Sequence, residues 1–200
     1  MNKSTDIAWL AGIIDGEGCF SVKNPVRRGV GRTCHQVWLV LCNTSRAMVE
    51  RAAEIIEDLG CKRPAIRRVW KGKKATRYQF WINVVMKHDL LTVTEALLPH
   101  LTSKRIEGEV IAWFLRRACR DRSYKRTELD KVVLASLSAV KRCGGEAPAE
   151  VLDLLREVIP SEALLSSERQ RSDGGSERVE TRGVSLNDKL PHECPAPLHN

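Results

Sequence analysis

Residues 9–22, WLAGIIDGEGCFSV, combine a helical spacing of apolar residues with two glycines, Gly12 and Gly16, four positions apart. A glycine inside a helix costs about 1 kcal/mol relative to alanine. With Ala8, the two glycines form one line of small residues, because positions i, i+4 and i+8 share a helix face. Such a line lets a second backbone approach closely. The sequence therefore predicts that this helix, expected to start at Asp6 as its N-cap and to run to about Gly16, packs against another helix.

Two carboxylates, Asp15 and Glu17, stand where this helix ends. Glu17 lies between two glycines, which permit unusual backbone angles, so its carboxylate is expected to project from the end of the small-residue line. If two copies of the helix pack together, two such carboxylates meet at one point. They repel each other unless divalent cations bridge them, and oxygen ligands together with a phosphate oxygen suit Mg²⁺. A glycine-containing core helix with a polar end is the alternative interpretation.

The composition indicates one main core and a polyanionic partner. A hydrophobic share of 42% over 200 residues is enough to bury one domain. The formal net charge of +8 favours nucleic acid over an anionic membrane surface. No apolar run reaches about 18 residues and the N-terminus lacks a leader pattern. We therefore expect no membrane, no secretion and a cytoplasmic or organellar location.

The arrangement of reactive residues argues against several classes of site. The seven cysteines are odd in number and never arranged as CxxC, which argues against a zinc site and a disulfide framework. The five histidines share no metal-ligand spacing. GxSxG, P-loop and GxGxxG patterns are absent. The five tryptophans fall in predicted core elements, and we interpret them as packing groups.

The periodicity of apolar residues predicts an α+β core. The order is helix, two strands, helix, two strands and further helices. This order suits an antiparallel sheet with helices covering one face. The expected strands are 19–23, 34–42, 65–70 and 77–84, and the later helices are 45–59, stopped by Gly60, 89–98, broken at Pro99, and 106–118.

Beyond residue 120 the character of the chain changes. A capping box at Thr127 opens a predicted helix to about Cys143, and Pro148 starts a last helix. Residues 161–200 hold no aromatic residue and many Ser, Gly, Arg, Glu and Pro, so we expect a disordered tail. The predicted organisation is a core over 1–120, a helical extension over 121–160 and a tail over 161–200.

Basic residues gather in the two predicted hairpins, and a twisted antiparallel ribbon fits the major groove of DNA. Alternation along the fourth strand sets Arg77 and Gln79 opposite to Phe80, so these two polar side chains are expected to face DNA. For any single basic residue, a solvated surface is an equally good interpretation. The residues assigned to DNA binding are Ser21, Lys23, Arg27, Arg28, Arg32, His35, Arg67, Arg68, Lys71, Lys73, Lys74, Arg77 and Gln79.

Residues 10–18, LAGIIDGEG, resemble the LAGLIDADG motif that names a family of homing endonucleases, with six of nine letters identical. The order of elements over 6–119 resembles that family's αββαββα core with its saddle-shaped antiparallel sheet. The resemblance implies that motif helices form a central interface and that the acid at the eighth motif position, Glu17, binds the catalytic metal beside Gly16, as Mg²⁺ or Mn²⁺. It also implies a structural role for Asp15, the acid at the sixth position.

A second stretch, LPHLTSKR at 98–105, resembles the family's L-P-x-L-x-x-K segment before the last core helix. The resemblance implies that Lys104 is the active-site lysine. The alternative is an ordinary cation near a helix start, where the macrodipole is unfavourable. The family often has a polar residue that positions water at the end of the second strand. Cys42, Asn43 and Thr44 are candidates; we choose Asn43 as the catalytic residue, with a turn or capping role as an equally good interpretation.

The chain holds one copy of the motif, because residues 85–200 contain no second one. The partner helix is therefore expected from an identical subunit. The resemblance then implies a homodimeric, metal-dependent endonuclease that cuts both strands of a long, near-palindromic DNA site. The alternatives are a non-cutting binder on the same fold, either an intron-splicing maturase that binds RNA or a DNA-binding regulator, and a degenerate copy without a target. The residues assigned to the dimer interface are Ala8, Gly12, Asp15 and Gly16.

Overall fold

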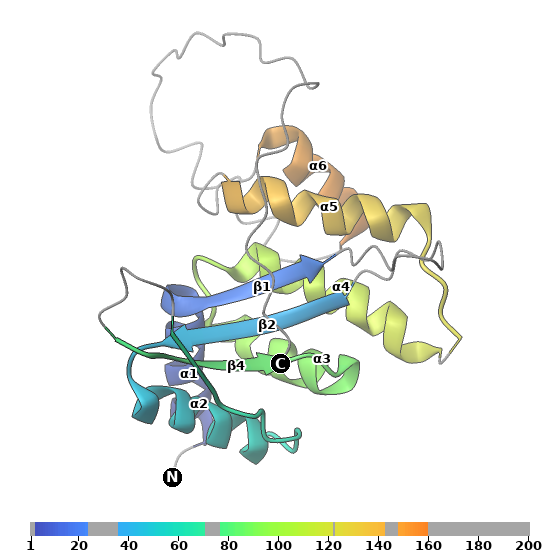
Figure 1. Cartoon of the computed structure of the whole chain (residues 1–200). Coiled ribbons are helices and arrows are strands. Elements are labelled where there is room, and N and C mark those ends of the chain that lie inside the picture. Colours follow the sequence, from blue (N-terminus) through green and yellow to red (C-terminus); the bar gives the residue numbers. More distant parts are fainter. Residues whose placement is uncertain (1–2, 24–35, 71–76, 122, 143–147, 160–200) are drawn as a thin grey trace, which may run out of the picture. The chain divides into compact units, whose positions relative to one another are not determined.

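The computed structural model describes residues 3–23, 36–70, 77–121, 123–142 and 148–159, apart from the side chains of residues 23, 138, 139 and 142. Within these ranges the order of elements is that of the predicted core followed by two further helices (Figure 1). The elements are α1 (Lys3–Glu17), β1 (Gly18–Lys23), β2 (Gln36–Asn43), α2 (Arg46–Asp58), β3 (Arg67–Val69), β4 (Gln79–Val84), α3 (Lys87–Leu97), the 3₁₀ helix η1 (Leu98–His100), α4 (Arg105–Arg120), α5 (Glu128–Arg142) and α6 (Ala149–Val158).

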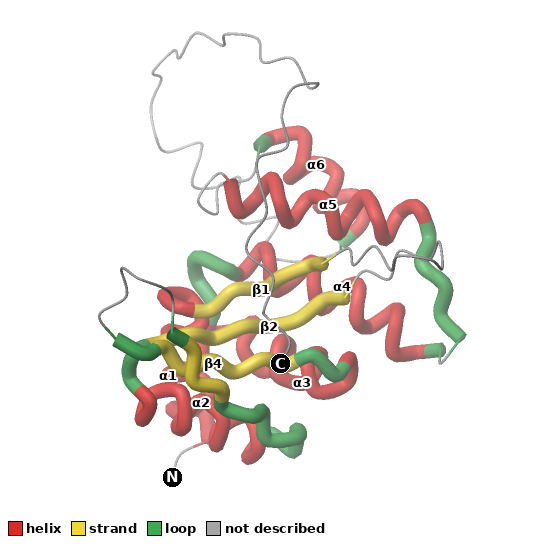
Figure 2. The backbone as a smooth tube through the Cα atoms, viewed as in Figure 1, coloured by secondary structure: helices red, strands yellow, loops and turns green. Residues whose placement is uncertain are grey.

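The strands form one antiparallel four-stranded sheet in the order β1-β2-β4-β3, with β1 and β3 at its edges. Alternate residues of a strand point to the same face. One face carries the buried side chains of Phe20, Leu39 and Ile82, and α1 to α4 pack against strands on this side (Figure 2). The predicted α+β fold with an antiparallel sheet is confirmed.

Local signals explain where the helices begin and end. The Ser45 hydroxyl accepts a hydrogen bond from the backbone N–H of Met48 at 3.4 Å and caps α2. Gly60 has a φ of 85°, a left-handed conformation that glycine adopts without strain, and it stops this helix as predicted. In the described ranges, no helix is both long and apolar enough to cross a membrane.

The start of α1 differs from the prediction. The helix already includes Lys3, so Asp6 lies inside its first turns and is not the N-cap. The Asp6 carboxylate instead pairs with the guanidinium of Arg51 in α2, at 2.7 Å between Oδ1 and Nη2. This long-range ion pair is invisible to a local capping rule.

The extension begins with the predicted capping box. The Thr127 N–H donates to the Asp130 carboxylate at 2.7 Å, and the Asp130 N–H donates to the Thr127 hydroxyl at 3.2 Å. α5 packs on α4, and α6 packs on α5. The expected tail over 161–200 lies outside the described residues, and the domain boundaries stay a prediction.

The tryptophans agree with the prediction of packing groups only in part: Trp113 is partly buried against the core, but none of the five is fully buried. Trp9 and Trp70 are 37% and 49% exposed. Trp38 and Trp81 are half-buried, and they lie on the open face of the sheet because they alternate with the buried residues of β2 and β4. A sheet with helices on one side has one core face, so strand residues of the other parity face away from the core.

Candidate active site

The line of small residues on α1 faces away from the chain's own core. Leu10 and Ile14 are buried on the other side of the helix. Ala8, Gly12 and Gly16 are exposed, and a Cβ added to either glycine would meet no atom of the described residues within 4 Å. The side of α1 that is predicted to meet a partner helix is therefore not covered by the described part of the chain.

Gly18, by contrast, is required by the chain itself. A Cβ at this position would lie 2.8 Å from the Cα and from the carbonyl oxygen of Ile14, which real side chains do not tolerate. Because Gly18 has no Cβ, β1 starts directly against the last turn of α1. This junction fixes Glu17 as the last residue of the helix.

Asp15 holds the segment before α4 against the end of α1. Its carboxylate accepts hydrogen bonds from the N–H and the hydroxyl of Thr102, both at 2.7 Å, and from the N–H of Lys104 at 2.9 Å. Burial raises the pKa of Asp15, but the hydrogen bonds from Thr102 and Lys104 outweigh it and hold this pKa below its ordinary value. The side chain predicted at the dimer interface is thus engaged within its own chain.

Lys104 reaches the same helix end with its side chain. Its ammonium group donates to the carbonyl oxygen of Ile14 at 3.0 Å and to that of Asp15. Lys104 is the N-cap residue of α4, but its charge lies on the C-terminal carbonyls of α1, where the macrodipole favours a cation. The sequence argument that this lysine sits unfavourably at a helix start is therefore wrong, since its long side chain carries the charge elsewhere.

Glu17 follows these carbonyls and is exposed. It makes no hydrogen bond or ion pair with any described residue. The backbone carbonyl of Gly16 precedes it directly. This donor set consists of hard oxygen atoms, which fits Mg²⁺ or Mn²⁺, although one chain supplies too few of them to complete a coordination shell.

A buried carboxylate that sequence reasoning missed lies next to this end of α1. The Glu107 side chain, on α4, is 7% exposed and its Oε2 has no hydrogen-bond partner among the described residues. Burial raises its pKa; the charges of Lys141 and Lys104 lower it, without cancelling the effect of burial. The only sequence signal is an acidic residue at helical spacing within the apolar stripe of α4.

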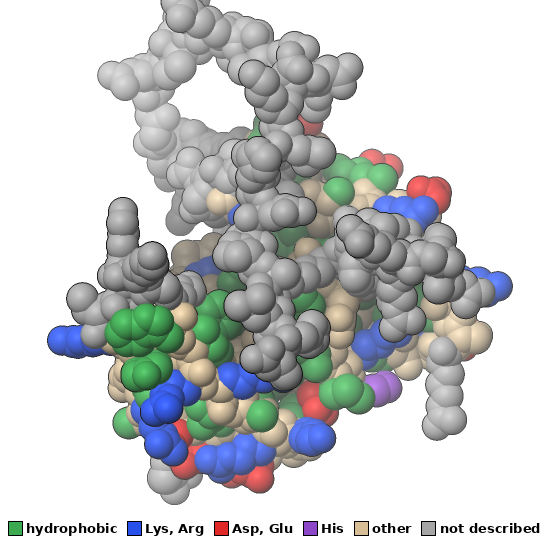
Figure 3. All heavy atoms as spheres, viewed as in Figure 1, with side chains coloured by type: hydrophobic (Ala, Val, Ile, Leu, Met, Phe, Trp, Pro, Cys, Tyr) green, Lys and Arg blue, Asp and Glu red, His purple; other side chains and the backbone are tan. Residues whose placement is uncertain are grey.

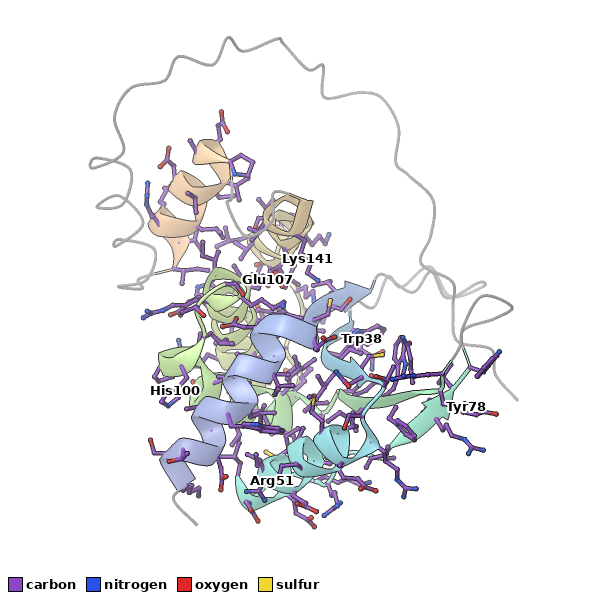
Figure 4. The ribbon with its side chains drawn as sticks, turned by 90° about the vertical axis from the view of Figure 1, so that its left-hand side faces the viewer. Trp38, Arg51, Tyr78, His100, Glu107 and Lys141 are labelled. Carbon is purple, nitrogen blue, oxygen red and sulfur yellow. The ribbon has the colours of Figure 1, made fainter. Side chains whose placement is uncertain are left out.

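Lys141 comes from α5, in the extension, and was not predicted either. Its Nζ lies 4.0 Å from Glu107 Oε2 and donates to the carbonyl oxygen of Phe20 and to Cys19 Sγ at 3.3 Å. Figure 4 shows Glu107 and Lys141 near each other beside the C-terminal end of α1. No local motif marks this lysine, because its partners are more than 30 residues away in the sequence.

Asn43 ends β2 near the α1–β1 junction, since Leu41 pairs with Gly18. Its side-chain oxygen accepts a hydrogen bond from the N–H of Ser45 at 2.8 Å. This is the turn role that the sequence left open, and it engages the oxygen that a water-positioning role requires.

The open face of the sheet carries several residues assigned to DNA binding. Ser21 alternates with buried Phe20, and Arg67 pairs with Trp81 on the same face. Figure 3 shows Lys and Arg side chains beside hydrophobic ones at the lower left of this view. Among the described side chains of the strands, this face carries one basic residue, Arg67, and the two indoles of Trp38 and Trp81.

Other residues assigned to DNA binding are placed differently. Gln79 lies on the open face and accepts a hydrogen bond from the thiol of Cys42 at 3.3 Å. Arg68 pairs with Phe80, which points to the other face, and its guanidinium lies 4.6 Å from the centre of the exposed Tyr78 ring. Arg77 is exposed just before β4. Of the residues assigned to DNA binding, the side chain of Lys23 and all of Arg27, Arg28, Arg32, His35, Lys71, Lys73 and Lys74 lie outside the described part of the chain.

The chain is similar to known proteins in structure. No protein-family model and no curated protein sequence matches the chain. The homing endonuclease I-CvuI, in complex with its target in the presence of Ca, matches with a TM-score of 0.52 and 21% identity, over 78% of this chain and 96% of that chain. I-CvuI in complex with the I-CreI target, uncleaved in the presence of Mg, matches with a TM-score of 0.51 and 20% identity over the same shares.

A third match extends further along this chain. The LAGLIDADG homing endonuclease I-GzeII, in complex with a DNA target, matches with a TM-score of 0.50 and 14% identity, over 93% of this chain and 54% of that chain. These identities are too low to carry chemistry from one protein to another, but the element order and sheet agree with the resemblance at residues 10–18. The chain has the fold of the LAGLIDADG homing endonucleases.

Proposed function

We propose that the chain is a divalent-metal-dependent, site-specific DNA endonuclease that cuts both strands of a long, near-palindromic site as a homodimer. One observation carries the proposal. The Lys104 ammonium lies on the last carbonyls of α1, immediately before Glu17, which is exposed and has no partner among the described residues. A cation able to bind an anion and a carboxylate able to bind a metal thus lie at one helix end, next to a helix face that no described residue covers.

The homodimer supplies the second half of the site. An isologous twofold contact between two α1 helices along Ala8, Gly12 and Gly16 brings two Glu17 side chains together. A near-palindromic site follows from the same twofold axis. Size-exclusion chromatography with light scattering on DNA checks this step, and a species of only 22.5 kDa protein mass contradicts it.

Glu17 and the Gly16 carbonyl from each chain are the groups that would hold a divalent cation. Two chains and the DNA phosphate together provide the oxygen ligands that one chain lacks. Such a cation supplies polarisation of the scissile phosphate and an acidified water. The share of the reaction that this chain's own side chains perform is positioning and charge stabilisation.

Lys104 is suited to stabilising the negative charge that develops during cleavage. An ammonium group has three N–H donors, and the carbonyls of Ile14 and Asp15 accept two of them. The third remains for a phosphate oxygen on which negative charge develops. Asp15 holds the Lys104 backbone in place, so its structural role supports the chemistry indirectly.

DNA binding is proposed for the open face of the sheet. Arg67 on this face, together with the net charge of +8, favours a polyanion. The neighbours I-CvuI and I-GzeII are themselves complexed with DNA targets. Phosphate contacts would dominate the affinity and make it fall steeply with salt.

The test starts from selection of a target, because the site sequence is unknown. Binding to a DNA library in Ca²⁺ isolates the target, and Mg²⁺ then starts cleavage. We expect cutting by the wild-type protein, and a loss of at least about 10²-fold in Glu17→Gln with binding retained. Glu150→Gln, an exposed glutamate on α6, is the matched control and should cut normally. A selected DNA target that the wild-type protein binds but does not cut in Mg²⁺ contradicts the proposed endonuclease function.

A second candidate is a non-cutting nucleic-acid binder, either a maturase that binds RNA or a DNA-binding regulator. The observation that favours the RNA-binding form is the pair of indoles, Trp38 and Trp81, on the open face, because aromatic side chains stack on unpaired bases. Stimulated splicing of a host intron supports the maturase. Tight binding to duplex DNA without cutting in Mg²⁺ supports the regulator.

A further inference from the structure

The helical extension places one lysine side chain close to the C-terminal end of α1. Lys141, in the last turn of α5, donates to the carbonyl oxygen of Phe20 and to Cys19 Sγ. β1 is an edge strand, so a carbonyl that does not pair with β2 is open to such a donor. The extension is thereby attached two to three residues after Glu17.

Glu107 gives this attachment an electrostatic consequence. Its carboxylate is buried, its Oε2 lacks a hydrogen bond within the described part of the chain, and Lys141 Nζ lies 4.0 Å away. The charge of Lys104 also acts on Glu107. Lys104 is the N-cap of α4 and precedes Glu107 by three residues, a spacing at which side chains at a helix start are neighbours, and its ammonium lies on the carbonyls of α1. A buried charge without a partner is strongly unfavourable, so removal of Lys141 would leave Lys104 as the other cation whose charge acts on Glu107 to neutralise it.

We propose that Lys141 is a positioning residue for DNA cleavage, which neutralises Glu107 from the extension and thereby leaves the Lys104 ammonium on the end of α1 beside Glu17. This inference rests on the proposed endonuclease function. The extension is then a working part of each active site, because Lys104 is in position only while α5 is docked. A lysine ammonium sits on a flexible four-carbon stem, so Lys104 is free to move onto Glu107 when Lys141 is removed.

The alternative is that Lys141 only fastens the extension to the core. The two roles differ in what Glu107→Gln does. If Lys141 neutralises Glu107, then removing the Glu107 charge makes Lys141 dispensable for cleavage. If Lys141 is a fastener, Glu107→Gln has no rescuing effect, because the contact with the Phe20 carbonyl is lost in either background.

The experiment compares the full-length wild type with Lys141→Met, Glu107→Gln and the double variant on the selected DNA target. Lys131→Met is the matched control, since this lysine is on the same helix but pairs at 2.6 Å with the exposed Glu128. Three quantities are measured: the single-turnover cleavage rate in Mg²⁺ at saturating DNA, the Kd for DNA in Ca²⁺, and the Tm. The rate and the Kd separate positioning of the reacting groups from binding.

We expect Lys141→Met to lower the saturated cleavage rate by about 10- to 100-fold, as supporting residues of metal sites do, with the Kd unchanged. Glu107→Gln, the double variant and Lys131→Met should cleave within about threefold of the wild type. If Lys141→Met fails to fold, Lys141→Gln gives the same test, because it keeps a donor for the Phe20 carbonyl and removes the charge.

Two results overturn the proposal. One is a Lys141→Met rate within about twofold of the wild type, and the other is a double variant as slow as Lys141→Met. Wild-type cleavage combined with either result overturns this inference alone. Absence of wild-type cleavage on a selected target overturns the proposed function, and this inference with it.

Discussion

A buried carboxylate lies at each end of α5, and the two carboxylates differ in the hydrogen bonds that they accept. At the N-terminal end, the Asp130 side chain is fully buried and accepts hydrogen bonds from Thr127, from the hydroxyl of Tyr124 and from Arg117 at 3.2 Å. At the C-terminal end, Glu107 Oε2 accepts none from any described residue, and its ion pair with Lys141 spans 4.0 Å. One end is fully satisfied and the other is not.

The pKa of Asp130 is lowered and that of Glu107 is raised, in line with this difference. Burial raises the pKa of Asp130, but the hydrogen bonds from Tyr124 and Thr127 reverse the direction and leave it lowered. Burial raises the pKa of Glu107, and the charge of Lys141 does not reverse it. Hydrogen bonds, more than burial or charge alone, thus decide whether a buried carboxylate stabilises the fold. We infer that the contacts of Asp130 stabilise the docking of α5, and that the contact between Glu107 and Lys141 contributes little to stability and acts in positioning Lys104.

The largest effect is expected at the satisfied end. Asp130→Ala should lower the free energy of unfolding by about 3 to 4 kcal/mol at pH 7, because it leaves Thr127, Tyr124 and Arg117 without their partner. The lowered pKa means that Asp130 stabilises the fold above its ordinary value of 3.8 and loses this effect as the pH falls further. Urea unfolding measures the change.

The control for this experiment is Asp153→Ala, which removes an exposed pair with Arg156 on α6. Its effect should stay below about 0.5 kcal/mol. If Asp130→Ala is as mild as the control, the two ends of α5 do not differ in the way that their hydrogen bonds indicate.

A smaller effect is expected for Asp15, which resembles Asp130 in its bonds but is only half-buried. Asp15→Asn keeps the shape and replaces one acceptor oxygen by an amide donor, which faces the N–H donors of Thr102 and Lys104. We expect a loss of about 1 to 3 kcal/mol at pH 7. Since the pKa of Asp15 is lowered, the difference from wild type should shrink as the pH falls below 3.8. An equal loss at pH 3 and pH 7 contradicts this.

Much of this architecture could be predicted because its causes are local. The strands, the stop at Gly60 and the Thr127 capping box depend on neighbours within a few residues, and all are confirmed. Glu17 and Lys104 were each found through short motifs, and the structure brings the Lys104 side chain to the helix end that precedes Glu17. Their catalytic roles remain predictions.

The rest depends on contacts between distant segments, which a local pattern does not contain. Asp6 looked like a helix cap, but its partner is Arg51, 45 residues away. Glu107 resembles the other acidic residues of an amphipathic helix in the sequence, but its side chain is 7% exposed and lies 4.0 Å from Lys141 of α5. Lys141 has no distinguishing neighbour at all, since its contacts lie on β1 and α4.

The smallest effect, and the sharpest for the comparison, is expected for Glu107→Gln. The raised pKa means that the neutral form of Glu107 is the one the fold favours, so its contribution to stability is present below 4.5 and is lost as the pH rises through the raised value. Glutamine does not titrate. The variant and the wild type should therefore unfold alike near pH 4, and the variant should gain up to about 1 kcal/mol by pH 7.5.

The same substitution in a Lys141→Met background should gain more, because Lys141 lowers the pKa of Glu107 and its loss leaves the buried charge less compensated. Denaturant unfolding at pH 4 and pH 7.5 measures both gains. If Glu107→Gln instead loses stability at pH 7.5 and not at pH 4, the Glu107–Lys141 pair stabilises the fold in the way that Asp130 does. The two ends of α5 would then be equivalent, and the position of Lys104 would have to depend on Asp15 and on the carbonyls of α1 alone.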